Sequence, residues 1–214
     1  MQRQNHNKSY PLAKRQGKTK LILGITGSFG SGKTTVAKIF KSYKAEVIDA
    51  DKLAHNCIKR GAQAYKRMVA IFGKDILKKN RVIDRRKLSR VVFNKKNLLR
   101  RLNNIVHPQV IRIIKSRIKQ SRARLIVLDA PLLIEADLKK IVDKLIVVKA
   151  TQSAQIKRIQ KRSPLSSRDI LKRIRSQIPL RLKERLADFV IDNSGTLKRT
   201  RKQVRQIRRL LWKN

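Results

Sequence analysis

Glycine, lysine and threonine residues fall at a spacing that could bind the phosphates of a nucleotide in the stretch GITGSFGSGKTTVAKIF, residues 24–40. Gly27 is followed, after four residues, by Gly32, Lys33 and Thr34, which is the pattern of a phosphate-binding loop. Glycines let such a loop curl so that its backbone N–H groups point at phosphate oxygens, and the following helix adds the partial positive charge of its N-terminus. Lys33 would reach the β- and γ-phosphates, and the Thr34 hydroxyl would bind Mg²⁺. The pattern predicts a nucleoside triphosphate ligand, but switches, helicases, transporters and small-molecule kinases share it.

Two carboxylates in the stretch VIDAD could prepare a second molecule to receive a phosphoryl group. Asp49 and Asp51 follow a short apolar run, in a chain with only 13 acidic residues. Strand ends of a parallel sheet are where α/β proteins bind ligands, and an aspartate there could accept a hydroxyl proton or hold Mg²⁺ through water. One of the two could instead cap the helix that follows. We assign the cap to Asp49 and the chemistry to Asp51.

Five apolar runs predict the strands that would position these residues. They are rich in Leu, Ile and Val, and they read LILGIT at 21–26, AEVIDA at 45–50, LIVLDAPLLI at 125–134, DKLIVVKA at 143–150 and ADFVIDN at 187–193. Helical patterns separate the runs, beginning with TTVAKIFKSY in the loop stretch. This alternation favours an α/β fold with a parallel five-stranded sheet and helices on both faces.

Two long helical segments interrupt the alternation. Residues 52–122 show helical spacing throughout and are too long for a single crossover, so we expect a helical insertion that forms a subdomain over one end of the sheet. Residues 151–186 are a second helical and strongly basic stretch, in which KRSPLSSRD marks a turn and a helix start.

The two ends of the chain differ in pattern. Residues 1–20 have almost no apolar periodicity, and we expect a flexible basic arm there, more simply a frayed terminus than a tether for RNA or membrane. The last helix, roughly 196–212, would pack against the core through Val204, Ile207 and Leu211, because their spacing places them on one face.

The chain is extremely basic. Its 56 Lys and Arg residues give a formal net charge of +43 in 214 residues. Such a field attracts polyanions, which makes a nucleic-acid-stimulated P-loop ATPase a competing hypothesis. The charges are nevertheless spread along every amphipathic segment, aromatic residues make up only 4% of the chain, and no helicase motif is recognisable. We therefore predict no specific nucleic acid partner, only weak, salt-sensitive polyanion binding.

Cysteine content and hydropathy bear on the compartment. Cys57 is the only cysteine, so an intramolecular disulfide is excluded, and a lone thiol suits a reducing compartment or a packing role. No run approaches about 18 consecutive apolar residues, and the first residues lack the apolar stretch of a secretory signal. We expect a soluble cytoplasmic protein without a membrane partner.

Five stretches together resemble the dephospho-coenzyme A kinase family in their order and spacing. They are GITGSFGSGKTTVAKIF, VIDAD, VHP at 106–108, LDAPLLIE at 128–135 and ADFVIDNSG at 187–195, and the resemblance runs from Leu21 to the final helix. It implies a P-loop kinase fold that uses ATP and Mg²⁺ to phosphorylate the ribose 3′-hydroxyl of dephospho-CoA, giving CoA and ADP in the last step of coenzyme A biosynthesis. A kinase for a nucleoside monophosphate or another small metabolite would share the fold, but VIDAD together with DNSG argues against it.

The same resemblance divides the chain into parts. Within a kinase domain at 21–214, the core would comprise 21–51, 123–150 and 187–214, the substrate-binding insertion 52–122, and a mobile lid 151–186. The oligomeric state does not follow from the sequence.

On the acceptor side, the resemblance implies roles for four residues. Asp51 would be the base at the 3′-hydroxyl, and the acceptor cleft would contain His107, Pro131 and Leu132. His107 could instead simply begin a helix, because the proline after it favours a first helical position. Asp129 could equally lie near Mg²⁺ or form a turn.

On the nucleotide side, the loop would bind phosphates through Gly27, Ser28, Phe29, Gly30, Ser31, Gly32, Lys33, Thr34 and Thr35. Arg158 and Arg162 are the candidates for lid arginines that close over the ATP phosphates, although so basic a segment does not distinguish one arginine from another. The loop containing Asn193 would line the adenine of ATP. The family usually has glycine in place of Ser28 and a smaller aliphatic residue in place of Phe29. Neither departure removes an N–H donor, so phosphate binding should survive; the lid turn is also less acidic than usual.

Overall fold

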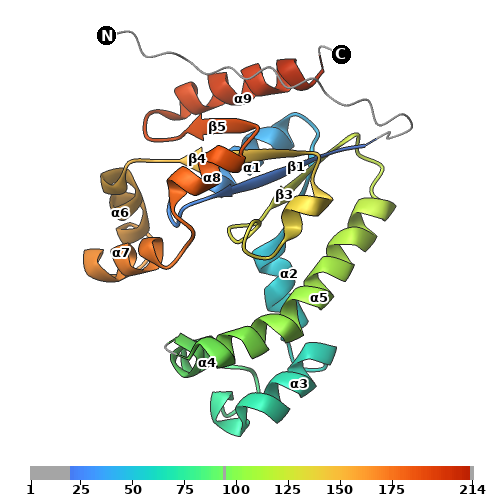
Figure 1. Ribbon diagram of the computed structural model, residues 1–214, viewed down its shortest axis with the longest axis vertical. Coiled ribbons are helices and arrows are strands. Elements are labelled where there is room, and N and C mark those ends of the chain that lie inside the picture. Colours follow the sequence, from blue (N-terminus) through green and yellow to red (C-terminus); the bar gives the residue numbers. More distant parts are fainter. Residues whose placement is uncertain (1–19, 94, 213–214) are drawn as a thin grey trace.

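Five parallel strands form one sheet in the computed structural model, which describes residues 20–93 and 95–212 (Figure 1). The strands are β1 (Leu21–Gly27), β2 (Glu46–Asp49), β3 (Leu125–Asp129), β4 (Lys144–Lys149) and β5 (Phe189–Asp192), in the order β2-β3-β1-β4-β5. The predicted α/β fold with five parallel strands is therefore confirmed. The predicted arm at 1–20 lies outside the described residues except for Lys20, whose Nζ donates to the carbonyls of Ile118 and Lys119.

The run LIVLDAPLLI is a strand only in its first half. β3 ends at Asp129, and residues 131–137 form turns before a short 3₁₀ helix, η2 (Leu138–Ile141). Pro131 has no N–H to give to a neighbouring strand, which favours the end of the ladder at this point. The apolar residues beyond it still enter the core, since Leu133 is fully buried.

The central strands are covered on both sides, which explains their nearly continuous apolar sequence. All five residues of β3 are buried, and β1 is buried from Ile22 onward. The parallel register aligns the carboxyl ends of the strands: Ile25 pairs with Asp129, and Asp129 pairs with Asp49. Asp49, Asp129 and the glycine-rich loop thus lie together at the carboxyl ends of the strands.

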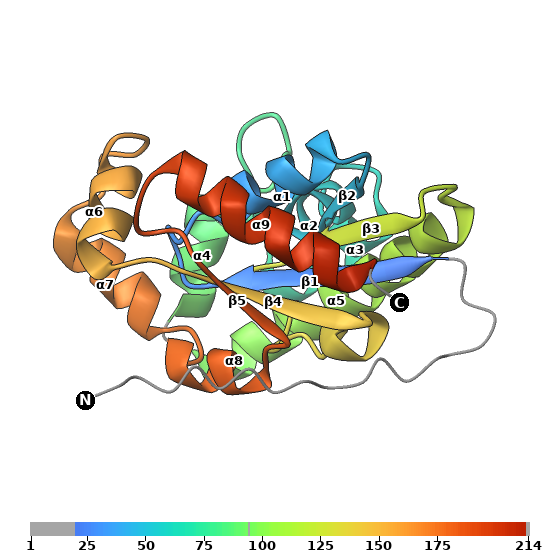
Figure 2. The same ribbon diagram turned by 90° about the horizontal axis from the view of Figure 1, so that it is seen from above.

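Helices cover both faces of the sheet, as predicted (Figures 1 and 2). α1 (Lys33–Ser42) and α9 (Leu197–Leu211) pack on one face, whereas α2 (Ala50–Cys57) and α5 (Lys96–Gln120) contribute to the core on the other. The predicted contacts of the last helix are confirmed, because Val204, Ile207 and Leu211 are all buried.

Residues 52–122 form the expected run of helices, which extends away from the sheet (Figure 1). α2 is followed by α3 (Gln63–Phe72), the 3₁₀ helix η1 (Lys74–Ile76), α4 (Arg85–Phe93) and α5. The alternative that His107 begins a helix is wrong, since α5 runs for 25 residues with Pro108 inside it. Ile105, Val110 and Ile114 are buried on both sides of the proline, and this packing offsets the lost backbone hydrogen bond.

Residues 151–186 form three short helices, of which α6 and α7 lie beyond the carboxyl ends of the strands (Figure 2). They are α6 (Gln152–Gln160), α7 (Ser167–Arg175) and α8 (Leu180–Leu186). The predicted helix start is confirmed, because the side chain of Ser166 caps α7 by accepting the N–H of Asp169. In the described part of the chain, no helix is both long and apolar enough to span a bilayer.

Candidate active site

The glycine-rich loop joins β1 to α1, and two of its glycines have backbone positions that a larger residue could not occupy. Gly27 has a φ of 151° and Gly32 a φ of 90°. A Cβ atom would collide with the carbonyl oxygen of Val148 at the first position and with the side-chain amide of Asn193 at the second. Glycine at these two positions therefore lets the loop pack directly against Val148 and Asn193 and curl at the N-terminus of α1, where a phosphate could bind.

Lys33 lies folded back over this loop. It is 9% exposed, and its Nζ donates to the carbonyls of Gly27 at 3.2 Å and Ser28 at 3.0 Å. Burial lowers the pKa of Lys33 to about 8, although the nearby carboxylate of Asp129 acts in the opposite direction. Its ammonium is therefore mostly protonated at pH 7, at the place where the phosphates of a nucleotide would enter.

Asp129 faces the hydroxyl of the first helical turn. It is 6% exposed, and its Oδ2 accepts a 3.4 Å hydrogen bond from the Thr34 hydroxyl. Burial raises the pKa of Asp129 to about 6; Lys33 opposes this shift, and Asp49 and Asp51 add to it. A hydroxyl and a carboxylate so placed fit Mg²⁺, which takes few protein ligands and completes its shell with phosphate and water. Within residues 20–93 and 95–212, no three His, Cys, Asp or Glu residues are grouped to hold a metal by themselves.

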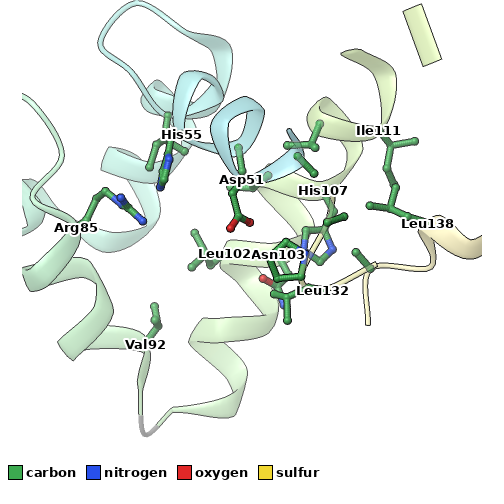
Figure 3. Close-up of a pocket in the computed structure, with 18 of the residues that line it drawn as sticks. Asp51, His55, Arg85, Val92, Leu102, Asn103, His107, Ile111, Leu132 and Leu138 are labelled. Carbon is green, nitrogen blue, oxygen red and sulfur yellow. The ribbon is translucent and has the colours of Figure 1, made fainter. Parts of the chain in front are cut away.

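The two aspartates of VIDAD have different surroundings. Asp49 caps α2, as predicted: its Oδ1 accepts the N–H of Lys52 at 2.9 Å. Asp51 lies in the first turn of α2, and its carboxylate points into a cavity (Figure 3). Burial raises the pKa of Asp51, and Asp49 raises it further, whereas Lys33 lowers it. Asp51 is thus a stronger base than an aspartate in water, within electrostatic reach of the phosphate loop.

The cavity in front of Asp51 has a volume of about 410 Å³, and its wall comes from α2, α4, α5 and the turn after β3. His107, Pro131 and Leu132 all line it, so the structure brings these three predicted residues together with Asp51. Figure 3 shows His107 and Leu132 beside Asp51. Burial lowers the pKa of His107, which is therefore neutral at pH 7. Much of the remaining wall is apolar and includes Ile58, Leu88, Val92, Leu102, Val110 and Ile111. The cavity suits a ligand with a large uncharged surface.

A second cavity, also of about 410 Å³, is lined by the glycine-rich loop, α6 and the residues after β5. Arg158, Arg162 and Asn193 line it together with six loop residues: Phe29, Gly30, Gly32, Lys33, Thr34 and Thr35. The other predicted loop residues, Gly27, Ser28 and Ser31, form the buried back of the loop. Most of the residues predicted to bind a nucleotide thus line one space.

The side chain of Asn193 is bound to the loop itself. It is 4% exposed; its Nδ2 donates to the carbonyl of Ser31 at 2.8 Å, and its Oδ1 accepts the hydroxyl of Thr200 at 2.8 Å. The Arg158 guanidinium donates to the carbonyl of Asn193 at 2.6 Å and to that of Ser31 at 3.5 Å. Asn193 and Arg158 therefore hold the shape of the loop.

The sequence does not single out three further residues that reach this edge of the sheet. The N–H of Phe29 donates to Oε1 of Gln177 at 2.9 Å, and the guanidinium carbon of Arg173 lies 5.7 Å from the centre of the Phe29 ring. Lys183 is fully buried and forms a 2.8 Å ion pair with Glu135. Lysine and arginine are so frequent in residues 151–186 that sequence spacing does not distinguish Arg173 and Lys183 from cations exposed to solvent.

Comparison with known sequences adds an independent finding. Residues 21–199 match the family model described as CoaE, Dephospho-CoA kinase. A dephospho-CoA kinase of Carboxydothermus hydrogenoformans is 42% identical over 197 residues, which cover 90% of this chain and 96% of that protein. A dephospho-CoA kinase of Bacillus licheniformis is 42% identical over 190 residues, which cover 87% of this chain and 94% of that protein.

Solved structures have the same architecture. The crystal structure of the Thermus thermophilus protein TT1252 matches with a TM-score of 0.82 at 30% identity, covering 92% of this chain and 100% of that one. The dephospho-CoA kinase of Campylobacter jejuni matches with a TM-score of 0.60 at 28% identity, with the same coverage. A shikimate kinase of Acinetobacter baumannii, with a TM-score of 0.53 at 16% identity over 90% of this chain and 93% of that one, shares the fold alone.

Proposed function

The chain belongs to the dephospho-CoA kinase family, and from this premise we propose that its two cavities hold ATP and dephospho-CoA on either side of Lys33 and Asp51. The reaction transfers the γ-phosphoryl group of ATP to the ribose 3′-hydroxyl of dephospho-CoA and gives CoA and ADP. The observation that carries the proposal is the placement of Asp51 in the wall of one cavity and of Lys33, with the glycine-rich loop, in the wall of the other. Two cavities placed in this way can hold donor and acceptor together, and positioning supplies much of the catalysis in phosphoryl transfer.

Asp51 accepts the proton of the 3′-hydroxyl. Its raised pKa makes it a better general base, and its position in the acceptor cavity gives it access to a sugar hydroxyl. The acceptor nucleoside lies against the wall formed by His107, Pro131 and Leu132. A neutral His107 there can donate or accept a hydrogen bond without adding charge.

Lys33 neutralises charge on the transferring phosphoryl group. It exchanges its present bonds to the carbonyls of Gly27 and Ser28 for bonds to phosphate oxygens. The Thr34 hydroxyl and the Asp129 carboxylate are the residues that would hold Mg²⁺. When bound, Mg²⁺ would supply positive charge that offsets the negative charge of the nucleotide phosphates.

Two helical segments serve the two substrates. Residues 52–122 act as the acceptor-binding insertion, which is supported by the lining of the acceptor cavity by α2, α4 and α5. Residues 151–186 act as a lid, which is supported by the contacts of Gln177 and Arg173 with Phe29. A closed lid excludes water, which would otherwise compete for the phosphoryl group.

The cytoplasm is the proposed location. The one thiol of the chain, Cys57, is buried and free, and a protein without disulfides suits a reducing compartment. The proposed small-molecule partners are dephospho-CoA and ATP, and the proposed metal partner is Mg²⁺.

A product assay tests the function. Purified protein is mixed with ATP, Mg²⁺ and dephospho-CoA, and CoA is detected by mass spectrometry. Parallel reactions contain AMP, shikimate or RNA in place of dephospho-CoA. Formation of CoA in clear preference to the other products is the expected result. Preferred phosphorylation of AMP or shikimate, or ATP hydrolysis that RNA stimulates without any CoA, would contradict it.

A further inference from the structure

We propose that Arg85 binds the diphosphate group of the acceptor and so makes the enzyme select acceptors that carry this group over uncharged nucleosides. The inference rests on the proposed function, since it concerns the acceptor cavity of that reaction. It assigns a specificity-determining role to a residue that no motif in the sequence singles out.

The position of Arg85 in the cavity is the first observation. Arg85 is the first residue of α4 and faces Asp51 and His55 of α2 across the cavity, where the three side chains are directed toward one space (Figure 3). Among the described residues that line this cavity, Arg85 is the only lysine or arginine. Lys and Arg make up 56 of the 214 residues of the chain. A cavity wall with a single lysine or arginine is therefore poor in cations for this protein.

The other titratable groups of the cavity add little positive charge to that of Arg85. The pKa of His55 is lowered by burial and then by Arg85 itself, and burial lowers the pKa of His107. Both histidines are therefore less protonated at pH 7 than a histidine in water. Asp51, the remaining charged group of the wall, is negative and would repel a phosphate. Arg85 is thus the positive charge that a diphosphate could find in the described wall.

Within the described part of the chain, Arg85 has no structural partner that would explain an arginine at this position. Among the described residues it makes no hydrogen bond or ion pair, and it acts on Asp51 and His55 only through its electrostatic field. The N-terminus of α4 is capped by another residue, Asp84, whose Oδ1 accepts the N–H groups of Arg86 at 2.8 Å and Lys87 at 3.2 Å. A cation in the first turn also opposes the helix dipole. Helix stability therefore does not account for an arginine at this position.

The chemistry of the acceptor supplies the matching group. In dephospho-CoA the diphosphate is attached to the 5′ position of the same ribose that presents its 3′-hydroxyl to Asp51. It must lie one sugar ring away from Asp51, and Arg85 lies across the same cavity. A planar guanidinium can donate two parallel hydrogen bonds to a phosphate, and a doubly charged group beside an apolar wall needs such compensation.

Acceptor kinetics with matched variants test the proposal. Arg85→Met and Arg86→Met are compared with the wild type, using dephospho-CoA and adenosine as acceptors at saturating ATP. Arg86 is the control because it is the next residue of the same helical turn but does not line the cavity. Calorimetric titration of dephospho-CoA, with adenosine as a competitor, measures the same preference in the absence of turnover.

The expected result is a change of preference. In Arg85→Met the ratio of kcat/KM for dephospho-CoA to that for adenosine falls by about 10- to 100-fold, mainly through KM for dephospho-CoA. Arg85→Lys keeps the charge but cannot donate two parallel hydrogen bonds, so its ratio should lie between those of Arg85→Met and the wild type. Arg86→Met should have the ratio of the wild type. Equal losses for both acceptors would overturn the proposal, because Arg85 would then act through Asp51. An unchanged ratio would also overturn it. If the wild type made no CoA at all, the proposed function itself would fall.

Discussion

Asp51 is the residue on which the proposed chemistry depends most directly. Its carboxylate projects into the acceptor cavity, and its surroundings raise its pKa. Asp51→Asn keeps the size of the side chain but cannot accept the proton. We expect its turnover number to fall by at least about 100-fold while the Kd for ATP stays within about twofold of the wild type. Steady-state kinetics and ATP titration measure the two quantities.

Asp49 offers a control for this substitution. Asparagine is as good a helix cap as aspartate, so Asp49→Asn should keep the bond from the N–H of Lys52. Its turnover should stay well above that of Asp51→Asn. Equal losses in the two variants would mean that the charge of the pair, and not the base Asp51, matters to the reaction.

Lys33 and Asp129 should limit the pH range of nucleotide use. The carboxyl of Asp129 ionises as pH rises through about 6, and the ammonium of Lys33 loses its proton as pH rises through about 8. The charged forms of both favour ATP with Mg²⁺. We therefore expect kcat/KM for ATP to rise across the lower pKa and to fall across the higher one. Assays from about pH 5 to about pH 9.5 would record the profile.

The Lys33→Arg variant separates the two limbs of this profile. Arginine stays protonated throughout the range, so the fall at high pH should disappear even if activity is lower at every pH. The acid limb should remain, and it reports Asp129 in the field of its neighbours, because Asp49 and Asp51 raise the pKa of Asp129. A fall near pH 8 that persisted in the variant would exclude Lys33 as its cause.

The residues of this site differ in how far the sequence predicts them. Asp49 and the loop follow from spacing, because a cap and a phosphate cradle are local structures. Lys183 and Gln177 do not, since their partners Glu135 and Phe29 lie far away in the chain. Only the folded arrangement of the helices shows those contacts.

At the scale of elements, an ion pair ties α8 to the turn after β3. The Lys183 side chain is 1% exposed and the Glu135 side chain 21%, and the Lys183 ammonium also donates to the carbonyl of Pro131 at 3.3 Å. The same carbonyl accepts the hydroxyl of Thr26 at 3.0 Å. The proposed lid is thus joined at its end to a wall residue of the acceptor cavity.

Removing either partner of this pair should destabilise the protein unequally. Glu135→Gln leaves a fully buried ammonium without its counter-ion, and we expect a loss of about 3 kcal/mol in the free energy of unfolding. Lys183→Met leaves a carboxylate that still reaches water, so its loss should be smaller. Urea unfolding of both variants measures the difference. A larger loss in Lys183→Met would show that packing, and not the buried charge, dominates.

The helices show that local sequence alone does not predict where every helix begins. The proline after His107 favours a helix start, yet it lies inside α5, a helix of 25 residues. Propensity is a local preference of up to about 3 kcal/mol for proline, and burial of Ile105, Val110 and Ile114 in the core outweighs it here. The strands were more predictable, because burial on both faces requires nearly continuous apolar sequence.

At the scale of the whole molecule, the acidic residues are few and many are engaged in local structure. Asp84 caps a helix, the carboxylate of Asp188 accepts the N–H of Leu145, and Glu184 pairs with Lys149 at 3.3 Å. The net charge of +43 is therefore carried by cations that have few acidic partners to neutralise them. A surface of this kind attracts polyanions over distances set by the ionic strength.

Association with RNA should accordingly be weak and dependent on salt. We expect a labelled RNA to bind at about 50 mM salt and to be released by about 200 mM, without dependence on its sequence. Fluorescence anisotropy measures binding, and the CoA assay under the same conditions measures activity. CoA formation should not increase with RNA. Stimulation that persisted at the higher salt concentration would instead favour the nucleic-acid-dependent ATPase.

The contact between Gly32 and Asn193 has a consequence for inheritance. The backbone at Gly32 has a left-handed φ, and the amide of Asn193 fills the space in which any Cβ would lie. Asn193 is itself held by Thr200 and Ser31. A smaller residue at 193 would remove the collision but not the unfavourable φ, so a mutation at the Gly32 codon cannot be rescued by a second mutation at the Asn193 codon alone.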